Sequence, residues 1–359
     1  MSEVQLHSDG SIKPEHGPEV TVTVADELDG VQRLSRLFRH SMQAGQIHPL
    51  LQVMQRRAGV QGGFRAAPIG APLRPPALAS ARIDVNVLRQ RIVQLPSLPQ
   101  AVLEVMALLG NEEASTADIA DRIEHDQALT ARTLRIANSA FYGVPGRIGT
   151  IRNAIGILGL RTVGTLLTTA AVSAQFSSAK CPEFQFGVFW RHAIATALTA
   201  RGLAQQLRMD EDTAFTAGLL HDIGRLALAT QFPAETRQVL RCAHEADLPM
   251  LDAERRVLDI DHLAVGVLIA THWHFPPIVV AAIEHHHAPG PGSVPSIVDI
   301  VHVADAFAHG LNPSASPDEM VPPVELAAWG RLGLTVPQYL AILESTSAGV
   351  TGLCEALAL

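Results

Sequence analysis

The chain of 359 residues carries a formal net charge of −8, and 47% of its residues are hydrophobic while only 4% are aromatic. This length allows two domains or one large helical body, and the apolar content excludes wholesale disorder. The shortage of Tyr, Trp and Phe argues against a β-sandwich or barrel and favours packed helices, and the acidic balance argues against nucleic acid as a general partner.

The first 82 residues divide into three predicted segments. Residues 1–24 are polar and mainly acidic, which is typical of a disordered tail. Residues 25–58 place apolar side chains at helical spacing and predict one or two amphipathic basic helices, broken near Gly45 or Pro49. Residues 59–82 are rich in Gly, Pro and Ala and are predicted to form a linker.

The stretch 31–82 contains eight arginines and no Asp or Glu. Such a basic stretch could touch nucleic acid or an acidic membrane surface. Aromatic residues for base stacking are scarce there, because only Phe38 and Phe64 occur. The favoured interpretation is that its helical part packs on an acidic face of its own body or of a partner.

Residues 83–310 are predicted to form the main helical domain, and its first part, about 83–178, is a lobe of short helices. Asp84 and Asp126 are the predicted N-caps of two of these helices, because each precedes a run with helical spacing. A further helix is predicted over 98–109, and two more within 150–176.

The second part of this domain, about 184–310, is the predicted core. Residues 184–207 predict one long helix, and residues 212–232 predict one helix that bends at Gly224. Asp261 is expected to cap the next helix, which Pro276 ends while opening another over 276–287, and a further helix follows over 294–310. Residues 311–359 are predicted to add C-terminal helices that complete an all-α body.

The three cysteines, Cys181, Cys242 and Cys354, are odd in number and lack the spacing of metal ligands. They are interpreted as reduced thiols of a cytoplasmic protein. No uncharged apolar run reaches about 18 residues, so no membrane span is predicted.

The dipeptide His221–Asp222 ends an apolar run and is the centre of the candidate site. Alone it is a weak signal, but other polar residues interrupt apolar helices in the same way, where an unpaired imidazole or carboxylate is costly to bury. A metal centre removes that cost. The predicted metal ligands are His192, His221, Asp222, His262, His285, His286 and Asp305.

Imidazoles and carboxylates are the ligands expected for Fe, Mn, Ni or Zn. Five histidines and two aspartates exceed one tetrahedral site, and they would suit two metals bridged by Asp222. His302 is expected to orient Asp305 as an outer partner. The alternative for each histidine is ordinary packing or a solvated helix end, and this is the expected role of His244, His272, His274 and His309.

Several segments resemble one known family. They are QLPSLPQAVLEVMALL (94–109), IEHDQALTARTLRIANSAFYG (123–143) and GLLHDIGRLAL (218–228). They resemble the HDOD domain, an offshoot of the HD phosphohydrolase superfamily, and the resemblance extends over about residues 88–310. It implies an all-α fold with an N-terminal helical lobe on an HD-type core, and a place in bacterial signal transduction. It also implies that many members of this family lack hydrolase activity.

The related HD-GYP phosphodiesterases carry a similar series of metal ligands, but this chain departs from their signature. His285-His286-His287 continues as Ala-Pro and not as Gly-Tyr-Pro, and Arg225 stands where that signature has lysine. An arginine can hold phosphate but cannot donate a proton near neutral pH. These departures put turnover of a cyclic dinucleotide in doubt. Asp222 and Arg225 are therefore catalytic candidates only for an active enzyme.

Two functions follow from these observations. The leading hypothesis is a regulatory binding and switching module with a metal site, whose partners are other signalling proteins or a phosphorylated nucleotide. The rival is a metal-dependent phosphohydrolase or phosphodiesterase. A homodimer is compatible with an all-helical body that carries an exposed basic arm.

Overall fold

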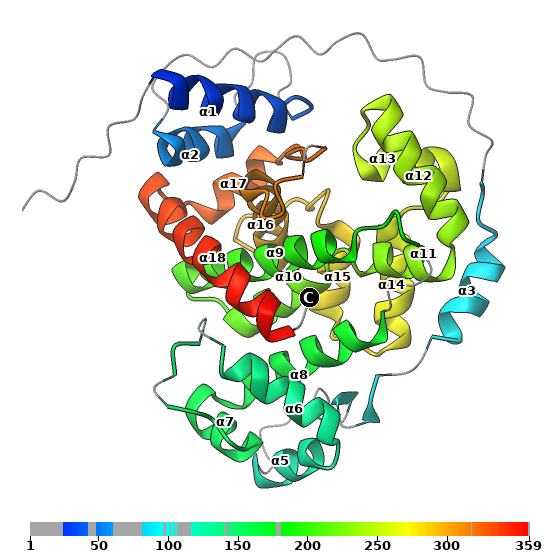
Figure 1. The fold of residues 1–359 in the computed structure, drawn as a ribbon, viewed down its shortest axis with the longest axis vertical. Coiled ribbons are helices and arrows are strands. Elements are labelled where there is room, and N and C mark those ends of the chain that lie inside the picture. The colour runs from blue at the N-terminus through cyan, green and yellow to red at the C-terminus, as the bar shows by residue number, and fades with distance from the viewer. Residues whose placement is uncertain are drawn as a thin grey trace, which may run out of the picture.

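The computed structural model describes residues 24–41, 48–59, 81–95, 98–100, 102–103, 105, 116–139, 142–144, 146–176, 181–316 and 318–357. The regular elements of these residues are α-helices (Figure 1), which confirms the predicted all-α class. The predicted tail up to residue 23, most of the linker and half of the helix expected over 98–109 lie outside the described residues. Among the described helices, none is both long enough and apolar enough to cross a bilayer.

The N-terminal lobe consists of α5 (Thr116–Glu124), α6 (Gln127–Ala137), α7 (Ile151–Leu158) and α8 (Leu160–Gln175). Asp126 caps α6 as predicted, because its carboxylate accepts a hydrogen bond from the Leu129 N–H at 3.0 Å. The lobe lies at one end of the molecule in Figure 1. Helix α8 joins it to the core, since α8 packs against both α6 and α10.

The core is built around α9 (Phe186–Leu207), which confirms the predicted long helix. Helix α9 runs through the middle of the molecule and packs against α10 (Glu211–Leu220), α16 (Ile297–Leu311) and α18 (Val336–Leu357) (Figure 1). Its apolar positions are filled mainly by alanine and leucine, and eleven of its residues from Phe189 to Ala200 are buried. These small side chains let the neighbouring helices approach closely around the polar cluster described below.

The helix is interrupted at His221 and Asp222, between α10 and α11 (Ile223–Gln231). The sequence had predicted one continuous helix with a bend at Gly224. Asp222 has φ −102° and ψ 15°, which ends the helical path before α11 begins. Gly224 serves a different purpose. A Cβ at this position would lie 2.0 Å from the carbonyl oxygen of His262, so glycine allows α11 to touch α14.

Four further helices cover the core beside α11: α12 (Pro233–Ala246), α13 (Met250–Leu258), α14 (His262–His272) and α15 (Pro277–His285). Asp261 caps α14 as predicted, with its Oδ1 3.0 Å from the Ala264 nitrogen. The helices α12 and α13 had no sequence prediction. The short α17 (Leu326–Leu332) precedes α18, so the two expected C-terminal helices are present.

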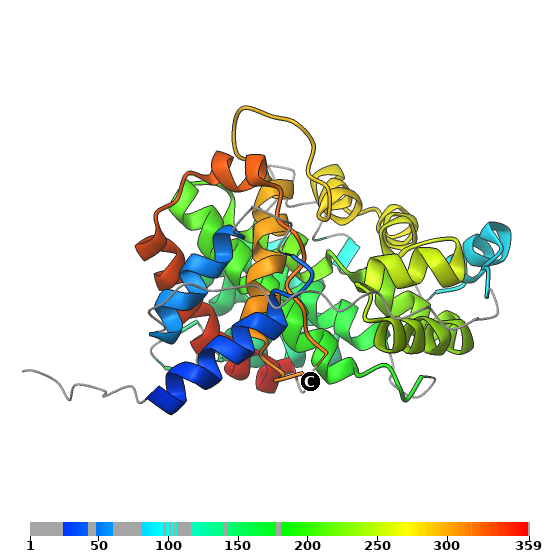
Figure 2. The same ribbon diagram turned by 90° about the horizontal axis from the view of Figure 1, so that it is seen from above.

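Three helices near the N-terminus pack on this body. Helix α3 (Val85–Val93) is capped by Asp84 as predicted and packs on α14. Helices α1 (Val24–Leu37) and α2 (Pro49–Ala58) form the N-terminal arm, and the interruption before Pro49 agrees with the predicted break. The arm packs on the opposite side of the molecule from α3, where α2 contacts α16 and α18 (Figure 2).

Candidate metal centre

Polar side chains from five parts of the core converge on one buried region. They come from α9, the α10–α11 break, the start of α14, the turn after α15, and α16. The structure brings together six of the seven predicted ligands and adds two histidines. The members of this cluster are His192, His221, Asp222, His262, His286, His287, Asp305 and His309.

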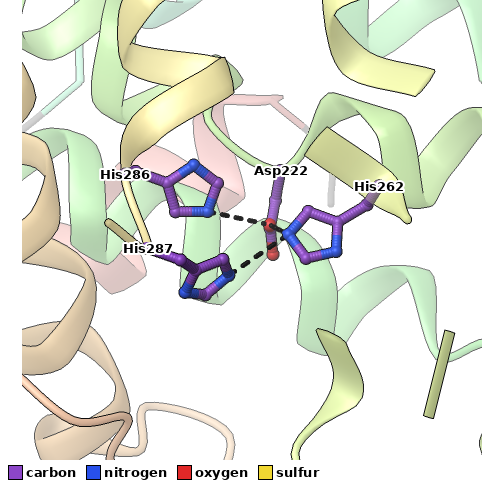
Figure 3. Close-up of side chains that lie close together, drawn as sticks. All are labelled: Asp222, His262, His286 and His287. Atoms are coloured by element: carbon purple, nitrogen blue, oxygen red, sulfur yellow. Dashed lines mark hydrogen bonds and ion pairs between the residues drawn. The ribbon is translucent and has the colours of Figure 1, made fainter. Parts of the chain in front are cut away.

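The first group of the cluster contains Asp222, His262, His286 and His287, whose ligand atoms lie within 4.8 Å of one another (Figure 3). The Nε2 atoms of His262 and His286 lie 3.2 Å and 3.7 Å from Asp222 Oδ1. His287 Nε2 lies 3.2 Å from His262 Nε2. Two imidazoles therefore face one carboxylate oxygen, and the third lies beside His262.

The orientation of three imidazoles is fixed by acceptors on their outer side. His221 Nδ1 donates to the Gly218 carbonyl at 2.7 Å, and His286 Nδ1 donates to the Ile283 carbonyl at 3.0 Å. His262 Nδ1 lies 2.6 Å from a carboxylate oxygen of the buried Glu254. Because Nδ1 carries the hydrogen in these bonds, a neutral ring presents the lone pair of Nε2 toward Asp222. Metal-binding histidines are commonly held in this way.

One buried atom in the group lacks a hydrogen-bond partner among the described residues. This atom is His286 Nε2, and its side chain is fully buried. A buried nitrogen without a partner costs free energy, on the order of 1–3 kcal/mol. The Nε2 atoms of His262 and His287 also face each other, which is unfavourable if both offer lone pairs. A divalent cation would accept all of these lone pairs, so the residues present fit a metal.

The second part of the cluster is centred on Asp305. Its Oδ1 lies 3.0 Å from His192 Nε2, 3.5 Å from His221 Nε2 and 3.3 Å from His309 Nε2. His309 is held from its other side by a hydrogen bond between its Nδ1 and the Glu319 carboxylate. These three nitrogens thus lie within 3.5 Å of a carboxylate oxygen, whereas His286 Nε2 in the first group lies 3.7 Å from Asp222 Oδ1.

Arg225 binds the other oxygen of Asp222. Its Nη1 donates to Asp222 Oδ2 at 2.8 Å from the first turn of α11. His221 Nε2 lies farther from the same oxygen, at 3.8 Å. The two oxygens of Asp222 therefore face different groups: Oδ1 faces the imidazoles of His262 and His286, and Oδ2 faces a guanidinium.

The charges of the cluster suit metal binding. Burial alone would raise the pKa of Asp222, but the neighbouring His221 and Arg225 outweigh it and hold that pKa well below its usual value. Burial, together with His287, holds the pKa of His286 well below its usual value, and burial with His262 lowers the pKa of His287 to about 3. Burial would lower the pKa of His262, but Glu254 and Asp222 raise it to about 9. His262 must therefore lose a proton when it binds a cation, whereas Asp222, His286 and His287 already have the forms that bind one.

The structure does not bring His285 into the cluster. Its side chain is 52% exposed and faces Glu284, and His287 lies in the cluster beside His286 instead. The reason lies in the end of α15. His285 is the last helical residue, and the chain then turns, which directs the next two side chains inward.

Three other residues have contacts in the cluster that were not predicted from the sequence. His309 was expected at the surface or in packing, but it lies one turn after Asp305 on the same face of α16, and the i, i+4 spacing was the available signal. His302 was expected to orient Asp305, but its Nδ1 donates to the His286 carbonyl at 2.6 Å and so holds the turn that carries His286 and His287. Glu254 lies on α13, where no helix was predicted.

The His309 contacts predict a pH dependence of stability. Burial alone would lower the pKa of His309, but the Asp305 and Glu319 carboxylates raise it to about 10. Because the folded-state pKa is raised, this stabilisation is complete below pH 6.5 and is lost as the pH rises toward 10. Between pH 7 and pH 10, the free energy of unfolding of the parent protein should fall on the order of 3 kcal/mol more than that of His309→Gln, because the variant has no imidazole to titrate.

Urea unfolding of the metal-free protein at these two pH values measures this difference. The exposed His285→Gln substitution is the matched control and should leave the difference unchanged. Equal losses of stability in His309→Gln and the parent protein would contradict the assignment.

Comparisons with known proteins agree with this architecture. The HDOD domain family model matches residues 95–289. A protein of Treponema pallidum that is described only as uncharacterized is 28% identical over 205 residues, which are 56% of this chain and 39% of that relative. The match thus covers well under half of the relative's length.

Solved structures share the fold. A predicted phosphohydrolase of Shewanella amazonensis SB2B is 26% identical, with a TM-score of 0.62 over 77% of this chain and 98% of that one. An HDOD domain protein of unknown function from Geobacter sulfurreducens is 23% identical, with a TM-score of 0.61 over 76% and 96% of the two chains. A predicted signal transduction protein of Marinobacter aquaeolei VT8 is 21% identical, with a TM-score of 0.63 over 77% and 65%. The last two show the fold alone. Because the family model matches more than half of the chain, the protein belongs to the HDOD domain family, as its sequence motifs predicted.

Proposed function

We propose that this protein is a regulatory module that holds one divalent metal and binds a phosphate-bearing ligand in the cavity beside it. The observation that carries the proposal is the division of Asp222 between two partners. Its Oδ1 faces the imidazole group, whereas its Oδ2 is bound by Arg225. His262, His286 and His287 would complete the metal site with Asp222.

This donor set, three imidazoles and one carboxylate, suits Fe, Mn, Ni or Zn. When bound, such a cation supplies positive charge and can polarise a phosphate oxygen. The protein's own residues orient the site. Glu254 and the Ile283 carbonyl hold two of the imidazoles, and His302 holds the turn after α15.

A cavity of about 320 Å³ adjoins the cluster and supports the choice of ligand. His192, His309 and Arg225 line it on the side of the cluster, and Arg39 lines it from the N-terminal arm. Guanidinium groups recognise phosphate through paired hydrogen bonds. Four carboxylates also line the cavity, those of Glu183, Asp247, Asp318 and Glu319, and each guanidinium is paired with an aspartate. We therefore infer a ligand whose phosphate replaces one of these pairings, as a phosphorylated nucleotide could, and that signalling partners respond to its binding.

The arrangement favours regulation over two-metal hydrolysis. A bridging carboxylate gives one oxygen to each of two cations. At Asp222 the second oxygen is already paired with the Arg225 guanidinium, at 2.8 Å. We infer that a permanent positive charge replaces the second metal and that Asp222 and Arg225 act in binding.

A metal-dependent phosphohydrolase is the second candidate, and it is favoured by one observation. His192, His221 and Asp305 form a second set of donors beside the first, with His192 and His221 nitrogens 3.3 Å apart. This set could hold a second cation if Arg225 moved away from Asp222. The likeness to the Shewanella amazonensis protein points to the same candidate.

Elemental analysis of the purified protein tests the metal site. We expect about one metal ion per chain in the parent protein and far less in His287→Ala, because that substitution removes one of the four ligands. His285→Ala is the matched control, since His285 precedes the site in the same turn region but is exposed. Equal metal content in the two variants would contradict the proposed ligand set.

Hydrolysis assays separate the two candidate functions. The regulatory proposal expects no turnover of cyclic dinucleotides or of bis(p-nitrophenyl) phosphate with Mn²⁺ or Fe²⁺ added. Turnover that is abolished by Asp222→Ala would overturn it in favour of the phosphohydrolase.

A further inference from the structure

The cavity beside the metal centre lies between two walls, and one side chain of the N-terminal arm touches both. Asp247, at the end of α12, belongs to one wall, and residues 318–320 belong to the other. Arg39 follows α1 and reaches both of them. We propose that Arg39 acts as a latch between the two walls of this cavity, so that its side chain must release them before a ligand reaches His192 and His309.

The contacts of Arg39 are those of a bridge. On one wall, its Nε and Nη2 donate to Asp247 Oδ1 at 3.1 Å and 3.0 Å. On the other, its Nη1 donates to the Glu319 carbonyl at 2.9 Å and its Nη2 to the Asp318 carbonyl at 3.4 Å. His40 adds a contact of 2.7 Å to Asp247 Oδ2. One guanidinium therefore ties together two segments about 70 residues apart in the chain.

The latch is connected to the metal cluster through Glu319. The carbonyl of Glu319 accepts the hydrogen bond from Arg39, and its carboxylate binds His309. His309 in turn contacts Asp305 at 3.3 Å. Movement of the 318–320 segment on release of Arg39 would therefore reach a side chain of the cluster directly.

The rest of the arm is seated so that Arg39 is held in place. Leu37 and Phe38 are buried, and the Leu37 carbonyl accepts a hydrogen bond from the Val321 N–H at 2.7 Å. In α2, Leu50 and Met54 pack against Gly310, the residue that follows His309. Because these contacts flank the latch, the arm lies against the cavity rim and against the helix that carries Asp305.

The latch itself can open at low cost. The side chains of Arg39 and Asp247 are 21% and 47% exposed. Ion pairs exposed to this degree contribute little to stability and weaken as salt increases. A phosphate group that enters the cavity would compete with Asp247 for the same guanidinium, which suits a contact that must be reversible.

A cysteine reporter measures whether the cavity is closed. Val188 lines the cavity and lies one turn before His192 on α9, whereas the three native cysteines are buried. The full-length Val188→Cys protein, freed of metal by a chelator, is labelled with a bulky maleimide. We expect Arg39→Ala to raise the labelling rate roughly 5-fold, the factor that corresponds to about 1 kcal/mol. Arg57→Ala is the matched control, because Arg57 binds Ser347 on α18 outside the cavity.

A second substitution tests the partner. Asp247 has a left-handed φ of 47°, which asparagine tolerates, so Asp247→Asn removes the charge without straining the backbone. It should raise the rate as Arg39→Ala does, and the double variant should add nothing. Unchanged labelling in Arg39→Ala, or an equal increase in Arg57→Ala, overturns the proposal.

Labelling of the native cysteines reports unfolding. If Arg39→Ala exposes them, Arg39→Lys is used in its place. A lysine can pair with Asp247 but lacks the forked guanidinium that reaches both walls. We therefore expect Val188→Cys to be labelled at an intermediate rate, and an unchanged labelling rate overturns the latch. Only the identity of the ligand, a phosphate-bearing molecule, is taken from the proposed function. Because labelling is measured without metal, failure of the latch and failure of the metal site give different results.

Discussion

Replacing Asp222 with asparagine should lower the affinity for a divalent metal by a factor of about 100 or more, which exceeds the usual effect of losing an outer partner of a ligand. Asp222 is the only anionic residue among the four proposed ligands, and it is 4% exposed. Asparagine keeps the size of the side chain but removes its charge. Zinc titration with a competing chelator would measure the change.

The same substitution should destabilise the metal-free protein by about 2 kcal/mol, because it leaves the Arg225 guanidinium without its carboxylate partner. Urea unfolding measures this second effect separately from metal binding. Asp259→Asn is the matched control, since Asp259 precedes His262 by three positions in the chain but is 69% exposed. Full metal affinity in Asp222→Asn would show that the metal site lies elsewhere.

Substitution of alanine for Gly224 is expected to have the largest effect on stability. The added Cβ would lie 2.0 Å from the His262 carbonyl oxygen and 2.8 Å from the Gly266 nitrogen. Both are backbone atoms of α14, so the clash can be relieved only by separating α11 from α14. We expect a loss of about 3 kcal/mol or more, and a fall of roughly 10 °C in Tm.

Gly156→Ala is the matched control for this prediction. Gly156 is an exposed residue inside α7, and among the described residues no atom beyond its chain neighbours and its own helix backbone lies within 4 Å of an added Cβ. Alanine favours a helix over glycine by about 1 kcal/mol, so the control should gain stability. Thermal unfolding of both variants checks the pair, and a stable Gly224→Ala protein would contradict the close contact between the two helices.

The sequence alone determined the helical class, the family and several helix starts. Asp84, Asp126 and Asp261 were predicted as N-caps, and all three accept hydrogen bonds from the first turn of their helices. These features are local, because a cap involves residues two or three positions apart. Six of the cluster's side chains were also identified, since a polar residue inside an apolar helix is visible in the sequence.

Only the tertiary structure decided which histidines face the cluster. His285, His286 and His287 are identical in type, and the direction of the turn after α15 exposes the first and buries the second. The role of Gly224 and the contact of Glu254 with His262 depend likewise on how helices distant in sequence approach each other. Apolar periodicity gives the buried face of a helix, but the position of that face relative to other helices is set by packing of the whole core.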